Sequence, residues 1–361
     1  MTNVFPAALM LHHHSVFGND FLVLLLRMNK ETLATIEEEK VLDKFSEERL
    51  LADTVFDTAR GMEEVARAAC DRKTGAGAGA GGPVGADGFI VAPHDPDFRP
   101  DDKGSLRAVM VLRNADGSFA EMSSNGVRCL AHACITAAGR DAAELKVLTG
   151  GGLHRVNIYK YEDPPEVWAS VGMHRVLPGP IIYPGVCEAV NLVLDETEYG
   201  QPRRIATGSV GNPHLVIDRA QGPVTPGELV VSDEVLTRLS RAVVPFFPQG
   251  INVEVIAPLP ATDGKVTAIA MAVHERGVGI TKACGTGAAV SAVRAAGWSL
   301  VGGTVIDVVM PGGTERVALA TPVCGEEAGK LVGFFQDAES EHLADHVFDA
   351  SQWLTSPDGA S

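Results

Sequence analysis

The chain contains 361 residues, of which 45% are hydrophobic and 21% are charged. This length exceeds what one compact core usually fills, so we expect two domains with substantial cores. The 46 acidic residues outnumber the 30 basic ones and give a formal net charge of −16. No basic patch stands out, which argues against nucleic acid or an anionic membrane as a partner.

The six cysteines are scattered and form no CxxC pair. This spacing is typical of reduced thiols in a cytosolic protein rather than of a disulfide framework. The longest apolar run near the start, Phe21–Leu26, is too short to span a membrane. No basic segment precedes an apolar stretch with a cleavage site, so we predict no signal peptide and a cytoplasmic protein.

Phe21–Leu26 is also the first predicted strand, because a short continuous apolar run is typical of a buried strand. His12–His14 precede it. Three adjacent side chains cannot all face one ion from a strand, so we expect a strand end or a surface run rather than a metal site. The carboxylates and cysteines show no metal-ligand spacing either. The acidic segments Glu37–Lys40 and Glu47–Glu48 predict a solvated helix face or an insertion.

A helix is expected from Asp57 to Ala69, where apolar residues recur at helical spacing. The next segment, Gly75–Gly82, contains only glycine and alanine. Its glycines are spaced loosely like those of a phosphate-binding loop. No clear strand precedes them and no helical pattern follows, as a dinucleotide fingerprint would require. We therefore predict a flexible loop insertion.

Short strands dominate the rest of the chain, with few helices, which favours a mixed α+β fold over a doubly wound sheet. The apolar segment Leu106–Leu112 runs into Asn114–Ser118, a turn cluster typical of a hairpin. The other predicted strands are Phe89–Val91, Val167–Val171, Arg204–Thr207, Leu215–Ile217, Val253–Ile256 and Val266–Val273.

One arrangement occurs twice, almost half a chain apart. In the first copy, the strand Arg107–Arg113 leads through a polar turn to Ser123–Gly126 and an amphipathic helix. In the second copy, the strand Thr267–Val273 leads through His274–Gly277 to Cys284–Gly287 and a helix of small residues. Two similar units of this kind indicate a duplicated domain.

Each copy places a nucleophile-type residue, Ser123 or Cys284, at the start of a helix. Free backbone N–H groups and the positive end of the helix dipole favour an anion there. They would hold a substrate carboxylate and lower the pKa of the Cys284 thiol. If the two copies face each other, Ser123 and Cys284 flank one ligand on opposite faces. This geometry suits removal of a proton from one face of an amino-acid α-carbon and delivery of another to the opposite face.

The motifs around these turns resemble the diaminopimelate epimerase family, in the family's order and from about residue 15 to residue 320. The segments that carry the resemblance are Gly18–Phe21, Cys70–Arg72, Val84–Gly88, Asn114–Ser118, Glu121–Arg128, Gly211–His214, Gln249–Asn252, Glu275–Gly279, Ala283–Gly287 and Pro311–Gly313.

The resemblance implies two pseudo-symmetric α/β halves, each a mixed sheet wrapped round a central helix, with the active site in the cleft between them. The N-terminal half would span residues 1–168 and receive a returning strand near residues 344–355, and the C-terminal half would span residues 169–343. The implied activity is cofactor-independent epimerisation of LL-2,6-diaminopimelate to the meso form by two-base proton transfer. No pyridoxal phosphate takes part, and the product serves lysine and peptidoglycan-precursor synthesis.

The resemblance also assigns site residues, motif by motif. Ser123 and Cys284 would be the acid–base pair, tuned by His214 and Glu275. The α-carboxylate would lie on the backbone N–H groups of Ser124, Asn125, Gly285 and Thr286. The other substrate-binding positions would be Asn19, Asn114, Asn212, Asn252, Glu275 and Arg276. Four amides and an arginine suit a second amino-acid head group, although each asparagine alone is also typical of a turn or cap.

The chain departs from the family at Ser123, where the family has cysteine, and at Ser124, where glycine is usual. An alcohol has a pKa nearer that of water, roughly 15.7, whereas a thiol lies at about 8.5. Ionising the alcohol therefore costs roughly 9–10 kcal/mol more, and a helix terminus offsets only about 1–2 kcal/mol. We expect Cys284 to be the base and Ser123 the proton donor, directly or through water.

Two alternatives stay open. One is a related racemase or β-elimination enzyme that acts on another amino acid. The other is a catalytically silent amino-acid-binding homologue, since Ser123 replaces the cysteine. Retention of Arg276 favours a diacidic substrate. The expected partner is the small-molecule substrate, and the sequence leaves the oligomeric state open, with a homodimer as one alternative.

Overall fold

The computed structural model describes residues 8–27, 59–94, 106–162, 165–172, 176–200, 202, 204–219, 222–261, 264–319, 333–335 and 338–351. The chain divides into two compact units. Unit 1 comprises Met1–Ser170 and Ala338–Ser361, and unit 2 comprises Val171–Asp337. The acidic segments Glu37–Lys40 and Glu47–Glu48 lie outside the described residues, as do Cys324 and residues 352–355.

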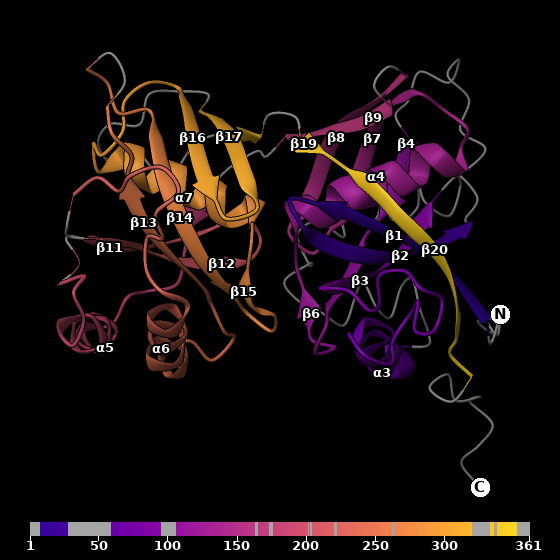
Figure 1. Cartoon of the computed structure of the whole chain (residues 1–361), viewed down its shortest axis with the longest axis horizontal. Helices are drawn as coiled ribbons and strands as arrows, with labels where there is room; N and C mark the ends of the chain where they lie inside the picture. Colours follow the sequence, from indigo (N-terminus) through magenta and orange to yellow (C-terminus); the bar gives the residue numbers. More distant parts are fainter. Residues whose placement is uncertain are drawn as a thin grey trace, which may run out of the picture. The chain divides into compact units, whose positions relative to one another are not determined.

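The sheet of unit 1 begins at a C-terminal strand that pairs with the first described strand of the chain (Figure 1). Successive neighbours along it are antiparallel, antiparallel, parallel, antiparallel, parallel and antiparallel. In this order the strands are β20 (Glu341–Asp349), β1 (Ala8–Val16), β2 (Asn19–Arg27), β3 (Gly88–His94), β5 (Val111–Asn114) with β4 (Leu106–Val109), β7 (Ala142–Thr149) and β8 (Gly152–Glu162). The short β6 (Phe119–Ala120) adds to β5, and β9 (Pro165–Gly172) pairs with β19 (Ala338–Glu339).

Two helices of unit 1 pack against opposite faces of its sheet. The helix α3 (Ala59–Cys70) joins a core that includes Leu22 and Phe89. The helix α4 (Ser124–Ala137) lies on the other face, where its Gly126 approaches Ile90. Because side chains alternate between the faces of a strand, Phe89 and Ile90 can serve these two cores from one strand.

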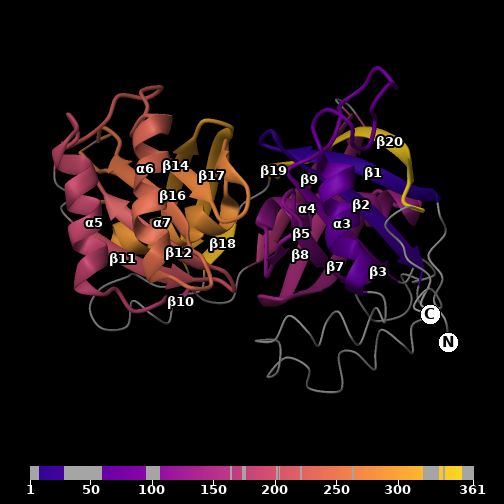
Figure 2. The ribbon, with the colours of Figure 1, turned by 90° about the horizontal axis from the view of Figure 1, so that it is seen from below.

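Unit 2 repeats this construction (Figure 2). Its neighbouring strands are antiparallel, antiparallel, parallel, antiparallel, parallel, antiparallel and antiparallel. In this order they are β10 (Leu177–Pro178), β11 (Arg204–Ser209), β12 (Pro213–Asp218), β13 (Asn252–Pro258), β14 (Ala268–Glu275), β16 (Val305–Met310), β17 (Gly313–Leu319) and β18 (Gly333–Phe335), and β15 (Gly279–Thr281) folds back on β14. The helices are α5 (Pro184–Asp195), α6 (Asp233–Val243), the 3-10 helix η2 (Val244–Phe246) and α7 (Gly285–Gly297).

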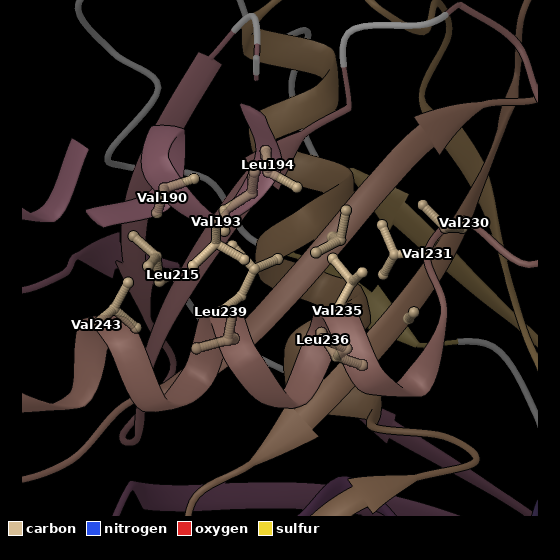
Figure 3. Close-up of a cluster of buried hydrophobic side chains, with 14 of the residues drawn as sticks. Val190, Val193, Leu194, Leu215, Val230, Val231, Val235, Leu236, Leu239 and Val243 are labelled. Carbon is tan, nitrogen blue, oxygen red and sulfur yellow. The ribbon is translucent and has the colours of Figure 1, made fainter. Parts of the chain in front are cut away.

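The sheet of unit 2 also has a helix layer on each face. On one face, α5 and α6 lie side by side (Figure 2) and bury an apolar core against the strands (Figure 3). Leu215 and Val253 point into this core. The neighbouring positions of those strands therefore face α7 on the opposite side. Contact with α7 is direct, because the Ser291 hydroxyl lies 3.3 Å from the sulfur of Met271 in β14.

The two units share a run of strand orientations. From β1 to β8 and from β11 to β17, neighbours are antiparallel, parallel, antiparallel, parallel and antiparallel. In each unit a short turn after the middle antiparallel pair leads into the helix that the sheet curls around, α4 or α7 (Figure 1). The expected α+β fold of two similar halves, each a mixed sheet around a helix, is confirmed.

The predicted strands are present with small changes of length. The exception is Leu106–Leu112, which divides at Met110 into β4 and β5. The division arises because β4 pairs with β7 whereas β5 pairs with β3. No helix among the described residues is long and apolar enough to cross a membrane.

The three histidines lie in the middle of β1, and His13 and His14 are buried. A ring nitrogen of His13 lies 2.8 Å from the carboxylate of Asp20, and the ring of His14 packs against His132. The expectation of a strand end or a surface run is therefore wrong for these two. In the described part of the chain, no three His, Cys, Asp or Glu side chains are grouped so as to hold a metal ion.

The glycine and alanine segment Gly75–Gly82 forms consecutive tight turns. Backbone hydrogen bonds close these turns, for example from Ala78 N–H to the carbonyl of Gly75, and Gly85 N–H donates to the carbonyl of Ala76 across the segment. Ala76 lies in the same apolar core as α3. The segment is therefore part of the packed structure of unit 1.

Candidate active site

The turn before α4 has the geometry of a helix cap. Ser123 is the N-cap residue in an extended conformation (φ −142°, ψ 122°), and its hydroxyl accepts a hydrogen bond from Gly126 N–H at 3.1 Å. Ser124 and Asn125 follow as the first helical residues, both buried. The N–H groups of a first helical turn have no partner within the helix, so this position can hold an anion.

Asn19 and Asn114 lie at the same end of the sheet as this turn. The Asn19 side-chain N–H donates to Asp87 at 2.9 Å, and the amide of Asn125 donates to Asn19 at 3.4 Å. Asn114 ends β5 and donates to the Ser118 hydroxyl at 3.0 Å. The structure therefore brings the predicted residues of unit 1 together.

Two aspartates and an arginine hold Asn19 in place. Arg72 binds both oxygens of Asp20, at 2.6 and 2.8 Å, and also reaches Asp87 at 2.6 Å. Burial opposes ionisation of Asp20, but hydrogen bonds from His13 and Arg72 outweigh it and lower the pKa of this carboxyl. Burial and the negative charge of Asp20 raise the pKa of Asp87. Sequence reasoning did not assign these residues a role, although all three lie in the motifs that carry the resemblance.

The turn before α7 has the same geometry as the turn before α4. Cys284 is the N-cap residue (φ −139°, ψ 105°), and its Sγ accepts a hydrogen bond from Gly287 N–H at 3.4 Å. The Thr286 hydroxyl lies 3.3 Å from the same sulfur. Gly285 and Thr286 open the helix, as Ser124 and Asn125 do in unit 1.

His214 and two amides line the strand ends beside Cys284. Nδ1 of His214 lies 2.6 Å from Glu254, and Nε2 lies 3.1 Å from the side-chain oxygen of Asn212. Asn252 accepts a hydrogen bond from the backbone N–H of Arg276 at 2.8 Å. The predicted residues of unit 2 therefore also converge on one helix start.

Arg276 is fixed next to this group. Its guanidinium donates to the carbonyl of Gln249 at 2.8 Å, and its side chain covers Gly250. A side chain at position 250 would clash with Arg276, since a Cβ there would come within 2.4 Å of Arg276 Cδ. Gly250, in left-handed backbone at φ +73°, thus makes room for the arginine.

Burial raises the pKa of Glu275 and the pKa of Cys284 itself. Burial raises the pKa of Glu275 to about 6, against hydrogen bonds from Thr281 and Cys284 that lower it. Burial, with the negative charges of Glu275 and Glu254, also raises the pKa of the Cys284 thiol. The hydrogen bond from Gly287 N–H at the helix start lowers this pKa, as expected, but burial and the two carboxylates outweigh it. Removing a charge from water costs several kcal/mol, more than the about 1–2 kcal/mol that a helix end supplies.

Sequence reasoning also missed Glu254, which belongs to the cluster of unit 2. It lies in the middle of β13 with its side chain fully buried beside His214. The sequence indicates this residue only by its charge, because Glu254 interrupts the otherwise apolar run Val253–Ile256.

The two capped turns have similar backbone geometry, and each carries a polar cluster. Solved structures of amino-acid epimerases and racemases share the fold that holds these turns. A hydroxyproline epimerase from Agrobacterium vitis superposes with a TM-score of 0.55 at 14% identity, covering 96% of this chain and 93% of the other. A probable proline racemase from Agrobacterium radiobacter K84 gives a TM-score of 0.56 at 16% identity, covering 93% and 92%.

Sequence comparison identifies the family. The sequence profile described as diaminopimelate epimerase matches residues 207–322. The diaminopimelate epimerase of Corynebacterium aurimucosum is 34% identical over 270 residues, covering 74% of this chain and 86% of the relative. That of Rhodococcus erythropolis is 34% identical over 237 residues, covering 63% and 70%. The chain belongs to the diaminopimelate epimerase family.

Proposed function

We propose that the protein epimerises LL-2,6-diaminopimelate to meso-diaminopimelate without a cofactor, as a cytoplasmic enzyme of lysine and peptidoglycan-precursor synthesis. The observation that carries the proposal is the repeated cap, Ser123 before α4 and Cys284 before α7, in a chain of this family. An epimerase needs a proton acceptor on one face of the α-carbon and a donor on the other, and two equivalent turns can supply one each.

The first helical turns bind the substrate α-carboxylate in this proposal. Backbone N–H groups of Ser124 and Asn125 in α4, and of Gly285 and Thr286 in α7, are the donors. Four N–H groups at two helix ends stabilise the charge that develops when the α-proton leaves.

The distal amino-acid head of the substrate binds polar side chains in this proposal. Arg276 binds the distal carboxylate, because a guanidinium matches a carboxylate bidentately. The amides of Asn19, Asn114, Asn212 and Asn252 both donate and accept hydrogen bonds, as a head group with an ammonium and a carboxylate requires.

Cys284 acts as the base and Ser123 as the acid. The carboxylates of Glu275 and Glu254 disfavour the thiolate. The substrate brings an α-ammonium group, whose positive charge offsets theirs, so the thiolate forms most readily in the complex. The carbanion formed at the α-carbon is basic enough to take a proton from the Ser123 hydroxyl. The reverse direction requires Ser123 to accept a proton, which makes it the slower partner.

The decisive experiment is solvent deuterium exchange at the α-carbon of LL- and meso-diaminopimelate. The proposal expects deuterium in both isomers and interconversion between them. Loss of an amino or hydroxyl group from a related substrate would indicate an elimination enzyme instead. Binding without exchange from either isomer would indicate a catalytically silent binding protein.

A substitution at the first cap tests the acid–base assignment. Ser123→Cys should raise the epimerase turnover by tenfold or more, about the size of a general acid–base contribution at its lower end, because a thiol exchanges protons in both directions. Cysteine fits this cap, as Cys284 shows in the equivalent turn. The control Ser123→Ala keeps the backbone but removes the donor, and it should abolish turnover. An unchanged turnover in Ser123→Cys would contradict the assignment of Ser123 as the limiting acid.

A further inference from the structure

A continuous chain of polar contacts joins Glu254 to the sulfur of Cys284 inside unit 2. Glu254 lies 2.6 Å from Nδ1 of His214, and Nε2 of His214 lies 3.1 Å from the Asn212 oxygen. The Asn212 amide N–H donates to the Thr286 hydroxyl at 3.3 Å, and this hydroxyl lies 3.3 Å from Cys284 Sγ. All five residues that these contacts join, from Glu254 to Cys284, are buried.

The protonation of His214 determines which group donates and which accepts in each of these contacts. Both of its ring nitrogens face oxygen acceptors, a carboxylate on one side and an amide oxygen on the other. An imidazole donates from both nitrogens only when both carry a proton. With Nε2 donating to Asn212, the amide donates to Thr286, and the Thr286 O–H points at the sulfur. Each link then delivers its hydrogen toward Cys284, where it stabilises a thiolate.

Burial of the Glu254 carboxylate beside His214 costs free energy, so stability alone does not explain this pair. Oε2 of Glu254 is buried and has no hydrogen-bond partner among the described residues. Buried ion pairs of this kind are often no more stable than apolar side chains of the same size. Gly287 also has to lack a side chain here, because a Cβ at this position would lie 2.7 Å from Glu254 Oε1. A buried carboxylate kept at this cost points to a role in the chemistry.

We propose that Glu254 is a positioning residue that holds His214 with both ring nitrogens protonated, and thereby directs the hydrogen-bond chain through Asn212 and Thr286 onto the sulfur of Cys284. This inference rests on the proposed function insofar as Cys284 is the base.

A purely electrostatic role for Glu254 would have the opposite effect on the thiol. A carboxylate near the sulfur disfavours the thiolate, and Glu254 contributes to the raised pKa of Cys284 in this way. Removal of the charge alone would therefore make Cys284 easier to ionise. Loss of the directed chain would make the thiolate harder to form. The sign of the change separates the two roles.

The test is the rate at which iodoacetamide alkylates Cys284 at one mildly alkaline pH, followed by peptide mass spectrometry. Glu254→Gln should slow the alkylation by about fivefold, the change that corresponds to one net hydrogen bond. It should also lower kcat by about tenfold to a hundredfold, as loss of an orienting partner does, with KM within twofold. An unchanged or faster alkylation in folded Glu254→Gln protein would overturn the proposal.

A double-mutant cycle localises the effect. Thr286→Val removes the hydroxyl that joins Asn212 to the sulfur. In the Thr286→Val background, Glu254→Gln should have no further effect on the alkylation rate, because the chain is already broken. Additive effects of the two changes would overturn the proposal.

Two further variants control for the loss of any buried carboxyl and for misfolding of Glu254→Gln. Asp218→Asn changes another buried carboxyl on β12 and should leave Cys284 alkylation unchanged. If Glu254→Gln fails to fold, Glu254→Asp keeps the charge on a shorter side chain. Slower alkylation in Glu254→Asp supports the positioning role, and an unchanged rate overturns it. The alkylation readout needs no substrate, so a wild-type protein without α-carbon exchange would refute the proposed function and leave this test intact.

Discussion

Cys284 and Ser123 occupy the same backbone position in two units, yet their surroundings differ. Cys284 shares a buried site with Glu275, Glu254 and His214. In unit 1 the charged groups that contact the site lie beside Asn19, where Arg72 binds both oxygens of Asp20. The groups that can exchange protons near a capped turn are therefore concentrated in unit 2, which carries the thiol.

Glu275 should make the free energy of unfolding depend on pH, with its contribution more favourable at acid pH than at neutral pH. Its pKa is raised from the ordinary value of 4.5 to about 6, so the folded state binds a proton more tightly than the unfolded state. The contribution of this group is most favourable below pH 4.5 and is lost as pH rises through about 6. A shift of this size corresponds to about 2 kcal/mol.

Glu275→Gln should therefore raise the free energy of unfolding at neutral pH by up to about 2 kcal/mol, with little change below pH 4.5, while epimerase activity falls. Urea unfolding across this pH range measures the difference. Glu188→Gln, on the exposed face of α5, is the control and should show no such pH dependence. Equal stability changes at both ends of the range would contradict the raised pKa of Glu275.

The first turns of α4 and α7 carry a glycine at the same position, Gly126 and Gly287. Alanine inside a helix is normally more stable than glycine by about 1 kcal/mol. At Gly287 a Cβ would come within 2.7 Å of a buried Glu254 oxygen that His214 holds in place. At Gly126 the nearest atoms lie at 3.2 Å and beyond, and one of them is the flexible end of Ile90.

Gly287→Ala should accordingly destabilise the protein by about 1–3 kcal/mol, whereas Gly126→Ala should stay within about 1 kcal/mol of wild type. Thermal or urea unfolding of the two variants measures both values. Equal effects would show that Glu254 can move aside.

The strands were predictable from composition, and the contacts between them were not. Apolar runs such as Val253–Ile256 predict a strand but do not reveal which face each residue takes, so Glu254 escaped notice. The contact between Asn19 and Asn125 joins residues far apart in sequence, which local patterns cannot indicate. The resemblance named most of the polar cluster in advance. The raised pKa of Cys284 depends on burial and on the charges of Glu275 and Glu254, which the helix terminus alone could not indicate.

At the scale of the whole molecule, the C-terminal strand belongs to unit 1. The strand β20 pairs with β1 from Ala8 to Ser15, with one irregularity in register between His13 and His14. Deletion of residues 338–361 would expose the edge of β1 to water and to other chains.

We expect this truncation to lower the free energy of unfolding by several kcal/mol, in line with loss of a paired strand and its buried side chains, and to promote aggregation. The matched control removes only residues 352–361, which follow β20, and should behave like the full chain. Chemical unfolding with light scattering measures both effects. A truncated protein as stable as the control would show that β20 is dispensable.

The return of the chain to unit 1 also sets an order of events during synthesis. A growing polypeptide leaves the ribosome from its N-terminus, and domains generally fold as they emerge. All of unit 2, Val171–Asp337, is made after β1 and before β20. Unit 2 can therefore complete its sheet while unit 1 still has a vacant edge, and the first unit begun is the last one finished.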